Sequence, residues 1–453
     1  MKGFFTVMLA LYLPLLAATQ TTWIQQDANY PVALQSFDVE TVNANVAWTV
    51  GMTGDYTPLQ WNVGFDGHYF SRTTDGTNWN SGTFPSTGAG WTVNVCALSA
   101  DLAWIAFQDF GNGSHVFKTI NGGVSWEDEN IPVNTWIDFV HFWGNGAGLT
   151  MGDPDSLGFQ IATTGNGGNI WTRVNPAGIP AALPGEFSIN DMYTVVGNKV
   201  WYATNYGRVY YSPNKGYTWQ LYDSGMNAIP DGLTCGESGH CLLVFGDYSD
   251  TVSENLKFHL RHSADGGTTW EDATPADNGW SIWGIQYVPG GNGKVIGVFR
   301  RNNKTGPYET RISNDNGLSW QAIDTGTPLL RLDFVNPTAG WATEYKTSEN
   351  PTHIYKYTGN PLVGLFSPNA LAAEVSVSPN PATEMLHVEA RGLPSGDYRL
   401  LLNDGHGRLL RTVSLKTTAD IFQNIDLRGL PNGVYTLTVT GAEGSVAKRV
   451  VKG

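Results

Sequence analysis

A turn rich in Asn, Asp and Gly, followed closely by a tryptophan, recurs along most of this chain. Successive tryptophans of the series lie 45 to 56 residues apart. They are Trp23, Trp79, Trp126, Trp171, Trp219, Trp270 and Trp320. A repeat near 50 residues indicates a domain of repeated units, each of which buries its apolar face against its neighbours. This period constrains the fold more than any other feature of the sequence.

The composition favours many short strands joined by turns. The 453 residues include 54 Gly and 17 Trp, and only 15% are charged. No long stretch places apolar residues at helical spacing. We therefore predict an all-β fold with one large repeat domain.

Six of the turns share a pattern in which an Asp or Asn follows a Ser or Thr by two residues and precedes Gly. These six are Asp75, Asn121, Asn166, Asn214, Asp265 and Asp315. Such a side chain accepts backbone N–H groups within a hairpin turn, and Gly takes the positive-φ position. The pattern resembles the Asp box, or BNR repeat, of form S/T-x-D-x-G-x-T/S-W, although Asn replaces Asp in three copies and the first is one residue short. The resemblance implies a β-propeller whose boxes are structural turns away from the ligand face.

A short apolar strand lies between successive boxes, and we expect these strands to be the innermost of each blade. They occupy 47–50, 103–106, 148–151, 200–203, 241–244, 295–298 and 340–343. Trp23 precedes the first of them, whereas no box follows the last. The strand at 22–26 would therefore complete the last blade and close the ring, which removes exposed strand edges. We predict a seven-bladed propeller over residues 20–362, with six blades as the fallback.

The first 19 residues read as a secretory signal peptide. Lys2 provides the positive charge, residues 4–16 are apolar, and Ala17 and Ala18 offer a cleavage point. No later stretch approaches 18 apolar residues, so we expect no transmembrane segment. The mature protein is expected to leave the cytoplasm and to be secreted or attached at the outer-membrane surface.

Three cysteines bear on the compartment and on metal binding. Cys235 and Cys241 flank a hairpin-like turn, where an oxidising compartment would favour a disulfide. Cys96 lies in an apolar run and is expected to be a buried thiol. Zinc-ligand spacing is absent, so we predict no metal centre and no cofactor, with calcium kept open.

Charge is unevenly distributed along the chain. From Glu374 onward there are nine Lys or Arg and eight Asp or Glu, whereas the repeat region has 16 basic and 32 acidic residues. A repeat domain with a charge near −16 is a poor partner for nucleic acid or anionic membranes.

The last 80 residues differ in pattern from the repeats. Alternating strands predict a small antiparallel β-sandwich at 375–453, after a linker at 363–374. Four short motifs occur in this region: Val-Ser-Pro-Asn-Pro at 377–381, Asn-Asp-Gly-His-Gly-Arg at 403–408, a Leu-Pro-Asn-Gly turn at 430–433 and Lys-Arg-Val-Val-Lys at 448–452. In this order the four motifs resemble the C-terminal sorting domain of type IX secretion cargo, which implies the type IX machinery as partner and export across the outer membrane. A carbohydrate-binding or immunoglobulin-like appendage is the alternative.

The ligand face of a propeller with these boxes would be formed by the loops opposite the box turns. Candidate ligand-binding side chains on these loops are Tyr56, Trp61, His68, Asp153, Asp155, Arg208, Arg300 and Arg301. The aromatic ones would stack on a sugar or a peptide, or simply pack the loop. Asp153 and Asp155 would serve acid/base work or bind calcium, although a capped proline turn also explains them.

Two enzyme classes are the alternatives to binding. A sialidase needs three arginines around a carboxylate, and the Arg-Ile-Pro motif typical of its start is missing. A xyloglucanase-like glycoside hydrolase uses two propellers, and this chain has one. The sequence looks more like sortilin-type and photosystem-assembly-factor-like propellers. We therefore expect an exported binding scaffold for a glycan or protein ligand, without assigned catalytic residues, rather than an enzyme.

Overall fold

The computed structural model describes residues 22–53, 66–85, 89–247, 257–274, 279–301, 307–345, 351–363, 374–393, 396–404, 409–417, 420–441 and 444–453. The expected signal peptide and residues 364–373 of the expected linker lie outside this part of the chain. The chain divides into two compact units, Met1–Val363 and Gly364–Gly453. No helix among the described residues is long and apolar enough to cross a membrane.

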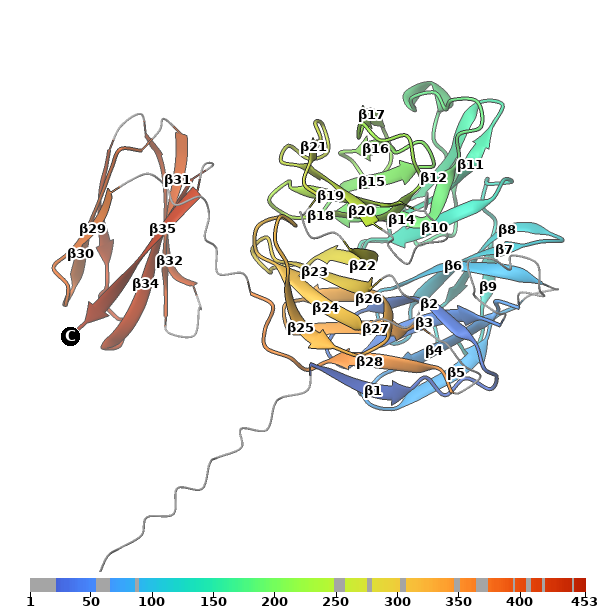
Figure 1. Cartoon of the computed structure of the whole chain (residues 1–453), viewed down its shortest axis with the longest axis horizontal. Helices are drawn as coiled ribbons and strands as arrows, with labels where there is room; N and C mark the ends of the chain where they lie inside the picture. Colours follow the sequence, from blue (N-terminus) through green and yellow to red (C-terminus); the bar gives the residue numbers. More distant parts are fainter. Residues whose placement is uncertain are drawn as a thin grey trace, which may run out of the picture. The chain divides into compact units, whose positions relative to one another are not determined.

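The described residues of the first unit form seven four-stranded antiparallel sheets (Figure 1). Sheet 1 has β2 (Gln35–Thr41), β3 (Ala47–Met52), β4 (Tyr69–Thr73) and β5 (Trp79–Thr83), and sheet 2 has β6 (Gly90–Ala97), β7 (Ala103–Asp109), β8 (Gly113–Thr119) and β9 (Glu127–Glu129). Sheet 3 has β10 (Ile137–Phe142), β11 (Gly148–Asp155), β12 (Gly158–Thr164) and β13 (Thr172–Arg173), and sheet 4 has β14 (Ser188–Val196), β15 (Lys199–Thr204), β16 (Arg208–Ser212) and β17 (Gln220–Asp223). Sheet 5 has β18 (Pro230–Cys235), β19 (Cys241–Asp247), β20 (Lys257–Ser263) and β21 (Glu271–Asp272). Sheet 6 has β22 (Trp280–Tyr287), β23 (Val295–Arg301), β24 (Tyr308–Ser313) and β25 (Gln321–Thr325). Sheet 7 has β26 (Leu329–Asn336), β27 (Ala339–Glu344), β28 (His353–Tyr357) and β1 (Trp23–Asp27). A short 3-10 helix, η1 (Pro176–Gly178), follows β13.

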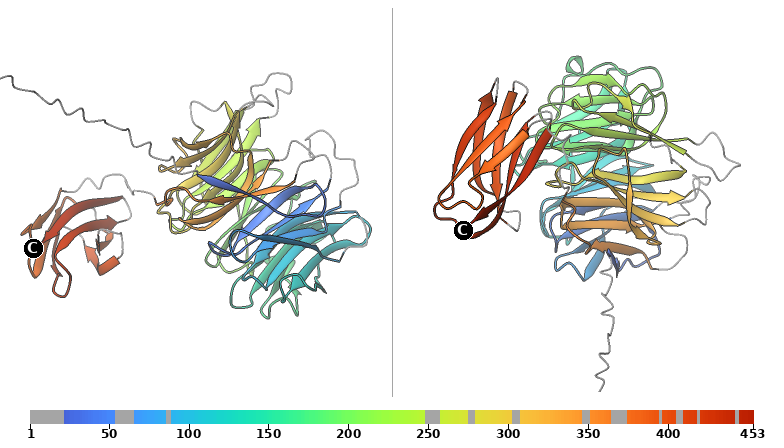
Figure 2. Two further views of the ribbon diagram at one scale, coloured as in Figure 1. Left: turned by 90° about the horizontal axis from the view of Figure 1, so that it is seen from below. Right: turned by 60° about the vertical axis from the view of Figure 1, so that its left-hand side comes forward.

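The first strands of the sheets surround a common centre (Figures 1 and 2). Each of β2, β6, β10, β14, β18, β22 and β26 contacts the next, and β26 contacts β2. The apolar strands that we expected to be innermost are β3, β7, β11, β15, β19, β23 and β27, which are the second strands, so this expectation is wrong. Neighbouring sheets cover both faces of a second strand, which favours continuous apolar sequence, whereas the inner strands border the centre and carry polar residues.

Side chains of the inner strands join neighbouring sheets. Asp38 Oδ2 on β2 accepts the Val95 N–H of β6 at 2.8 Å, and Gln286 Oε1 on β22 accepts the Phe334 N–H of β26 at 2.8 Å. Further acceptors of the same kind are Asn94, Thr234 and Asp333. These acceptors satisfy main-chain donors that would otherwise be buried without a partner.

The N-terminal strand pairs with the last strand of the first unit. β1 runs antiparallel to β28, with Trp23 opposite Tyr357 and Asp27 opposite His353. The two ends of the repeat region therefore share sheet 7.

The box turns connect the third and fourth strands of six sheets. Asn121, Asn166, Asn214, Asp265 and Asp315 each accept the backbone N–H four residues ahead through Oδ1. In the shorter first copy, Asp75 Oδ1 accepts from Thr77 N and Asn78 N, both at 2.8 Å. The Asn78 contacts hold the pKa of Asp75 well below its usual range. These six side chains thus build turns.

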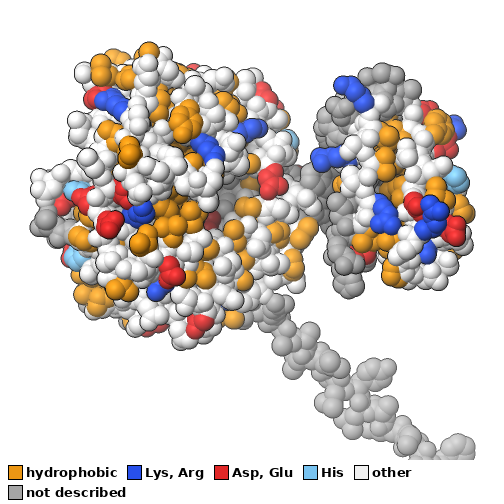
Figure 3. Space-filling model, turned by 180° about the vertical axis from the view of Figure 1, so that it is seen from behind, with side chains coloured by type: hydrophobic (Ala, Val, Ile, Leu, Met, Phe, Trp, Pro, Cys, Tyr) orange, Lys and Arg blue, Asp and Glu red, His pale blue; other side chains and the backbone are white. Residues whose placement is uncertain are grey.

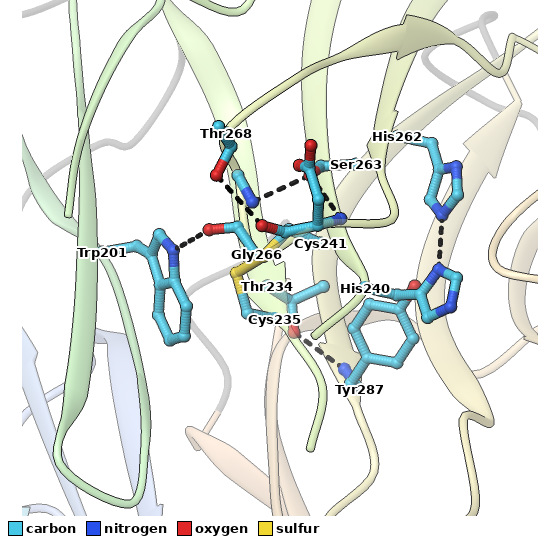
Figure 4. Close-up of a disulfide and its surroundings, with 12 residues drawn as sticks. Trp201, Thr234, Cys235, His240, Cys241, His262, Ser263, Gly266, Thr268 and Tyr287 are labelled. Carbon is cyan, nitrogen blue, oxygen red and sulfur yellow. Dashed lines mark hydrogen bonds between the residues drawn. A yellow bond between two sulfur atoms is a disulfide. The ribbon is translucent and has the colours of Figure 1, made fainter. Parts of the chain in front are cut away.

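A disulfide closes the hairpin between β18 and β19 (Figure 4). The Cα atoms of Cys235 and Cys241 lie 4.1 Å apart. His240, within the closed loop, contacts His262 Nε2 through Nδ1 at 2.8 Å, and His262 Nδ1 lies 3.0 Å from Glu271 Oε1. The hairpin is therefore tied to the outer strands of sheet 5.

The second unit consists of two antiparallel sheets. One contains β29 (Glu374–Ser378), β30 (Met385–Arg391) and β33 (Ile421–Asp426). The other has the order β32 (Leu409–Thr417), β31 (Gly396–Asn403), β34 (Gly433–Gly441) and β35 (Gly444–Lys452). Val388, Leu400 and Leu437 belong to the core of this unit.

Candidate ligand-binding face

The connections between the second and third strands lie at the opposite end of the third strand from the box turns, and we call this side of the first unit the loop face. Two of its predicted residues, Tyr56 and Trp61, lie outside the described residues. The other six come from sheets 1, 3, 4 and 6: His68, Asp153, Asp155, Arg208, Arg300 and Arg301.

Asp153 pairs with a second carboxyl group that the sequence did not reveal. The Ser188 N–H donates to Asp153 Oδ1 at 3.1 Å, and the Ser188 hydroxyl donates to Asp138 Oδ2. Burial raises the pKa of Asp153 to about 6. Burial, together with repulsion from Asp153, holds the pKa of Asp138 well above its usual range. The pair keeps a proton to higher pH than an exposed carboxyl does. Asp138 is only 1% exposed, so it is closed off from any ligand.

Asp155 has a different partner from Asp153. The terminal nitrogens Nη1 and Nη2 of Arg173 donate to its carboxylate oxygens, at 2.7 and 2.9 Å. This contact lowers the pKa of Asp155. The structure therefore does not bring Asp153 and Asp155 together as an acid/base pair. No group of three or more His, Cys, Asp or Glu side chains within the described ranges is placed to hold a metal ion.

Arg208 is held by a buried carboxylate. Its Nη1 donates to Glu186 Oε2 at 2.6 Å, and its Nη2 donates to Ala181 O at 3.2 Å. Glu186 also accepts from the Thr204 hydroxyl at 2.7 Å. Arg208 thus fixes the segment that follows η1 against sheet 4.

Arg300 and Arg301 contact aromatic rings on sheets 6 and 7. The Arg300 guanidinium lies 5.3 Å from the ring of Tyr308 and 4.6 Å from that of Tyr345. Arg301 lies 5.3 Å from the ring of Trp280. These are cation–π distances. Since Arg208 binds Glu186 and the other two bind rings, the three predicted arginines do not form the clamp that a sialidase requires.

His68 directly precedes β4, at the end of the connection between β3 and β4. Its Nδ1 contacts Asp66 Oδ1, and its ring stacks on Tyr69 with centroids 4.5 Å apart. This contact anchors the end of the loop where β4 begins.

Exposed apolar side chains lie on the loop-face side of neighbouring sheets 2 to 4. Phe110 and Leu157 are on the connections between second and third strands, and Phe187 directly precedes β14, where its carbonyl oxygen accepts the Asn205 N–H of the corresponding connection in sheet 4. Phe110 is 49% exposed, Leu157 65% and Phe187 40%. Phe110 packs on Trp136 with centroids 6.0 Å apart. Large apolar side chains exposed on several adjacent loops are typical of interaction surfaces. The sequence did not single them out because isolated apolar residues in loops carry no periodic signal.

A group of acidic side chains lies on the inner strands at the centre of the first unit. Asp38, Glu40, Asp191 and Asp333 are all half-buried. Burial raises the pKa of each of these four carboxyl groups, and it raises the pKa of Asp38 to about 6. Repulsion from Asp333 contributes to the raised pKa of Asp38. Asp38 and Asp333 accept main-chain N–H groups from the next sheet. These two carboxylates therefore have a structural role between sheets.

A shallow hollow of about 480 Å³ lies on the side of the box turns. Asn166, Ile170 and Tyr217, which belong to two neighbouring boxes, are among the residues that line it. It contains none of the predicted ligand-binding residues.

Comparison with known proteins identifies the tail and the fold. Residues 376–453 match the family of the secretion system C-terminal sorting domain. No curated protein matches the chain. YCF48 bound to D1 peptide is similar at 14% identity and a TM-score of 0.52, covering 75% of this chain and 98% of that one.

Two further structures are YCF48 from Cyanidioschyzon merolae and a GH74 xyloglucanase from Xanthomonas campestris. The former has 12% identity and a TM-score of 0.51, and covers 74% of this chain and 98% of that one. The xyloglucanase has 10% identity and a TM-score of 0.46, and covers 94% of this chain and 75% of that one. This likeness is too weak to bear on function. At these identities the YCF48 likeness shows the fold alone. The predicted β-propeller with a C-terminal sorting domain is confirmed.

Proposed function

We propose that this β-propeller, which carries a secretion sorting domain at its C-terminal end, is an exported protein that binds a polypeptide ligand on its loop face. The sorting domain indicates export to the cell surface or the medium. The proposal also assigns residues 1–19 to a signal peptide, which is removed on export, and residues 363–374 to a linker between the propeller and the sorting domain.

The exposed apolar side chains on the loops of sheets 2 to 4 carry the proposal. Leu157 and Phe187 expose much of their surface, and their burial by a ligand would contribute about 1–2 kcal/mol each. Asp155, at the end of β11 next to the loop of Leu157, forms an ion pair with Arg173 of β13, and this pair gives the surface a polar rim. Apolar anchors with a polar rim suit a polypeptide. YCF48 with its bound D1 peptide shows that a propeller of this fold can bind one.

A glycoside hydrolase is the less favoured alternative. It would need an accessible proton donor and a second carboxylate flanking the substrate. Asp138 and Asp153 are a carboxyl pair among the described residues on this side, and Asp138 is buried. The pair thus lacks the access that glycoside hydrolysis requires.

The test uses the mature full-length chain against a displayed library of random peptides and against a glycan array. We expect enrichment of apolar peptides, and at least tenfold weaker binding by the double variant Leu157→Ala/Phe187→Ala. The matched control is Ile120→Ala/Val124→Ala, which removes exposed apolar side chains from a box turn on the opposite side. This control should bind as the wild type does.

Two results would contradict the proposal. Equal weakening by both double variants would show that binding is not confined to the loop face. Glycan binding together with turnover of a sialoside or of xyloglucan would show that the protein is an enzyme rather than a binding protein.

A further inference from the structure

The hollow of about 480 Å³ between the third and fourth boxes is built from residues at which the repeat departs from its own pattern. The residue before the box tryptophan is Ser or Thr in the second, fourth, fifth and sixth boxes, but in the third box it is Ile170, which is 68% exposed. The fourth box exposes 52% of Tyr217, two residues before its tryptophan. Neither side chain is needed by its turn, because Asn166 accepts the Ile170 N–H and Asn214 accepts the Thr218 N–H. Both side chains line the hollow and are available to a ligand.

The exposed Ile170 also changes the bonding of Asn166. In the second box, Asn121 Nδ2 donates to the Ser125 hydroxyl at 2.8 Å. Ile170 occupies the position of that serine in the third box and has no hydroxyl, so Asn166 Nδ2 makes no hydrogen bond to any described residue. Its Oδ1 is engaged in the turn, which fixes the amide in place. Asn166 therefore presents a fixed donor to the hollow.

A second amide comes from Asn175, which caps the short helix η1. Its Oδ1 accepts the Ala177 N–H at 3.1 Å, and its Nδ2 has no hydrogen-bond partner within the described ranges. The helix is tied to the fourth box, because the Trp219 N–H donates to Gly178 O at 3.3 Å. Two amide donors and the exposed ring of Tyr217 thus line one hollow on a fixed frame.

The hollow has no net charge to offer a ligand. Among the described residues that line it, only Arg173 is charged, and both of its terminal nitrogens donate to Asp155. On the face of the first unit that Figure 3 shows, charged side chains are scattered among uncharged polar and apolar ones. The lining therefore favours a neutral ligand that can accept hydrogen bonds and cover an aromatic ring.

We propose that this hollow binds a neutral oligosaccharide, with Tyr217 stacked on a pyranose ring and the Asn166 and Asn175 amides donating to its hydroxyl oxygens. A pyranose carries C–H groups on its faces and hydroxyls around its rim, which suits an exposed aromatic ring beside amide donors. A polypeptide suits the hollow less well, since its N–H groups need acceptors and both asparagine oxygens are engaged. The volume is within the range of small-ligand sites. The site lies on the side of the box turns, so the proposal does not rest on ligand binding at the loop face.

The test titrates the mature full-length chain with cellohexaose, mannohexaose and chitohexaose by calorimetry. At least one of these sugars should bind with a dissociation constant of about 1 mM or below. Salt should have little effect, because no charged group is engaged. Tyr217→Ala should weaken binding at least about tenfold. The matched control is Leu318→Ala, at the same position of the sixth box and 59% exposed, which should bind as the wild type does.

Two further variants test the amide donor while preserving the turn. Asn166→Asp keeps the acceptor for the Ile170 N–H, as Asp does in the fifth and sixth boxes, and removes the donor, so sugar binding should weaken about fivefold. Its control is Asn121→Asp, whose carboxylate can accept from the Ser125 hydroxyl. Ile170→Ser gives Asn166 Nδ2 the partner that Asn121 has, so it should weaken sugar binding without lowering the melting temperature.

Three results would overturn the proposal. The first is that a folded wild-type chain binds none of the three sugars. The second is sugar binding that Tyr217→Ala and Asn166→Asp leave unchanged. The third is capture of peptides but of no sugar, lost in Tyr217→Ala, which would assign the hollow to a polypeptide. The loop-face variant Leu157→Ala/Phe187→Ala should leave sugar binding unchanged, so failure at either face is recognised separately.

Discussion

Trp23 lies opposite Tyr357 where β1 pairs with β28, and the two rings meet edge to face with centroids 5.2 Å apart. The Trp23 indole N–H also donates to the Thr310 hydroxyl at 3.0 Å, across 287 residues of sequence. The N-terminal strand is therefore bound to sheet 7 by pairing and to sheet 6 by a buried side chain. Such long-range contacts are made only when the ring is assembled.

Replacing Trp23 should weaken the whole first unit. Trp23→Ala removes a side chain that is only 6% exposed, and we expect a loss of about 3–5 kcal/mol in the free energy of unfolding. Urea denaturation followed by tryptophan fluorescence measures this loss. Ile24→Ala, on the same strand but 45% exposed, is the control and should cost less than about 1 kcal/mol. Similar losses in both variants would show that β1 is only loosely attached.

The sequence pattern of the box turns made the fold predictable, whereas the first strand of each sheet, which is the innermost, was not predicted from the sequence. Each box carries its own hydrogen-bonding pattern within eight residues, so local sequence encodes it. The strand β2 contains Asp38 and Glu40, and its pairing with β3 shifts between Ser36 and Asp38. Polar residues and an irregular register hide such a strand from a search for apolar periodicity.

The candidate site was less predictable because its contacts join different sheets. Asp153 was identified from its loop, but its partner Asp138 lies on β10 and its bridge Ser188 on β14. Nothing in the local sequence of Asp138 distinguishes it from a surface residue. Arg208 was likewise recognised without Glu186, 22 residues earlier, which occupies its guanidinium.

The acidic centre should make the first unit less stable as the pH rises. Burial raises the pKa of Asp38 to about 6 in the folded chain, so the folded state binds this proton more tightly than the unfolded state does. The resulting stabilisation is complete below about pH 4 and is lost as the pH rises through 6. Asp38→Asn keeps an oxygen acceptor for Val95 N–H and removes the charge. We expect it to be about 1–2 kcal/mol more stable than the wild type at pH 8 and equal to it at pH 4.

Urea denaturation at pH 4, 6 and 8 measures this difference. Asp101→Asn, whose side chain is 71% exposed, is the control and should leave the pH dependence unchanged. A wild-type chain whose stability rises between pH 4 and 8, with no gain from Asp38→Asn, would show that the centre is well solvated.

The disulfide should contribute a modest local stabilisation. Cys235 and Cys241 are six residues apart, and closure of so short a loop restricts the unfolded chain by about 2 kcal/mol. The double variant Cys235→Ser/Cys241→Ser should therefore unfold at lower urea concentration than the oxidised wild type. Reductant should bring the wild type to the same midpoint and leave the variant unchanged. If reductant leaves the wild type unaffected, the bond is absent from the native protein.

A glycine of the second box should resist substitution for two independent reasons. Gly123 has a φ of 84°, and a Cβ atom at this position would overlap the Phe70 ring of the neighbouring sheet. Gly123→Ala should cost about 2–3 kcal/mol in unfolding free energy, through backbone strain and displacement of that ring. Gly165→Ala, in the third box, is the control, because a Cβ atom added there would meet no described atom within 4 Å and the backbone φ of this residue is ordinary. Equal stability of the two variants would mean that the box turn and Phe70 adjust freely, and that the contact between sheets 1 and 2 is not fixed by this glycine.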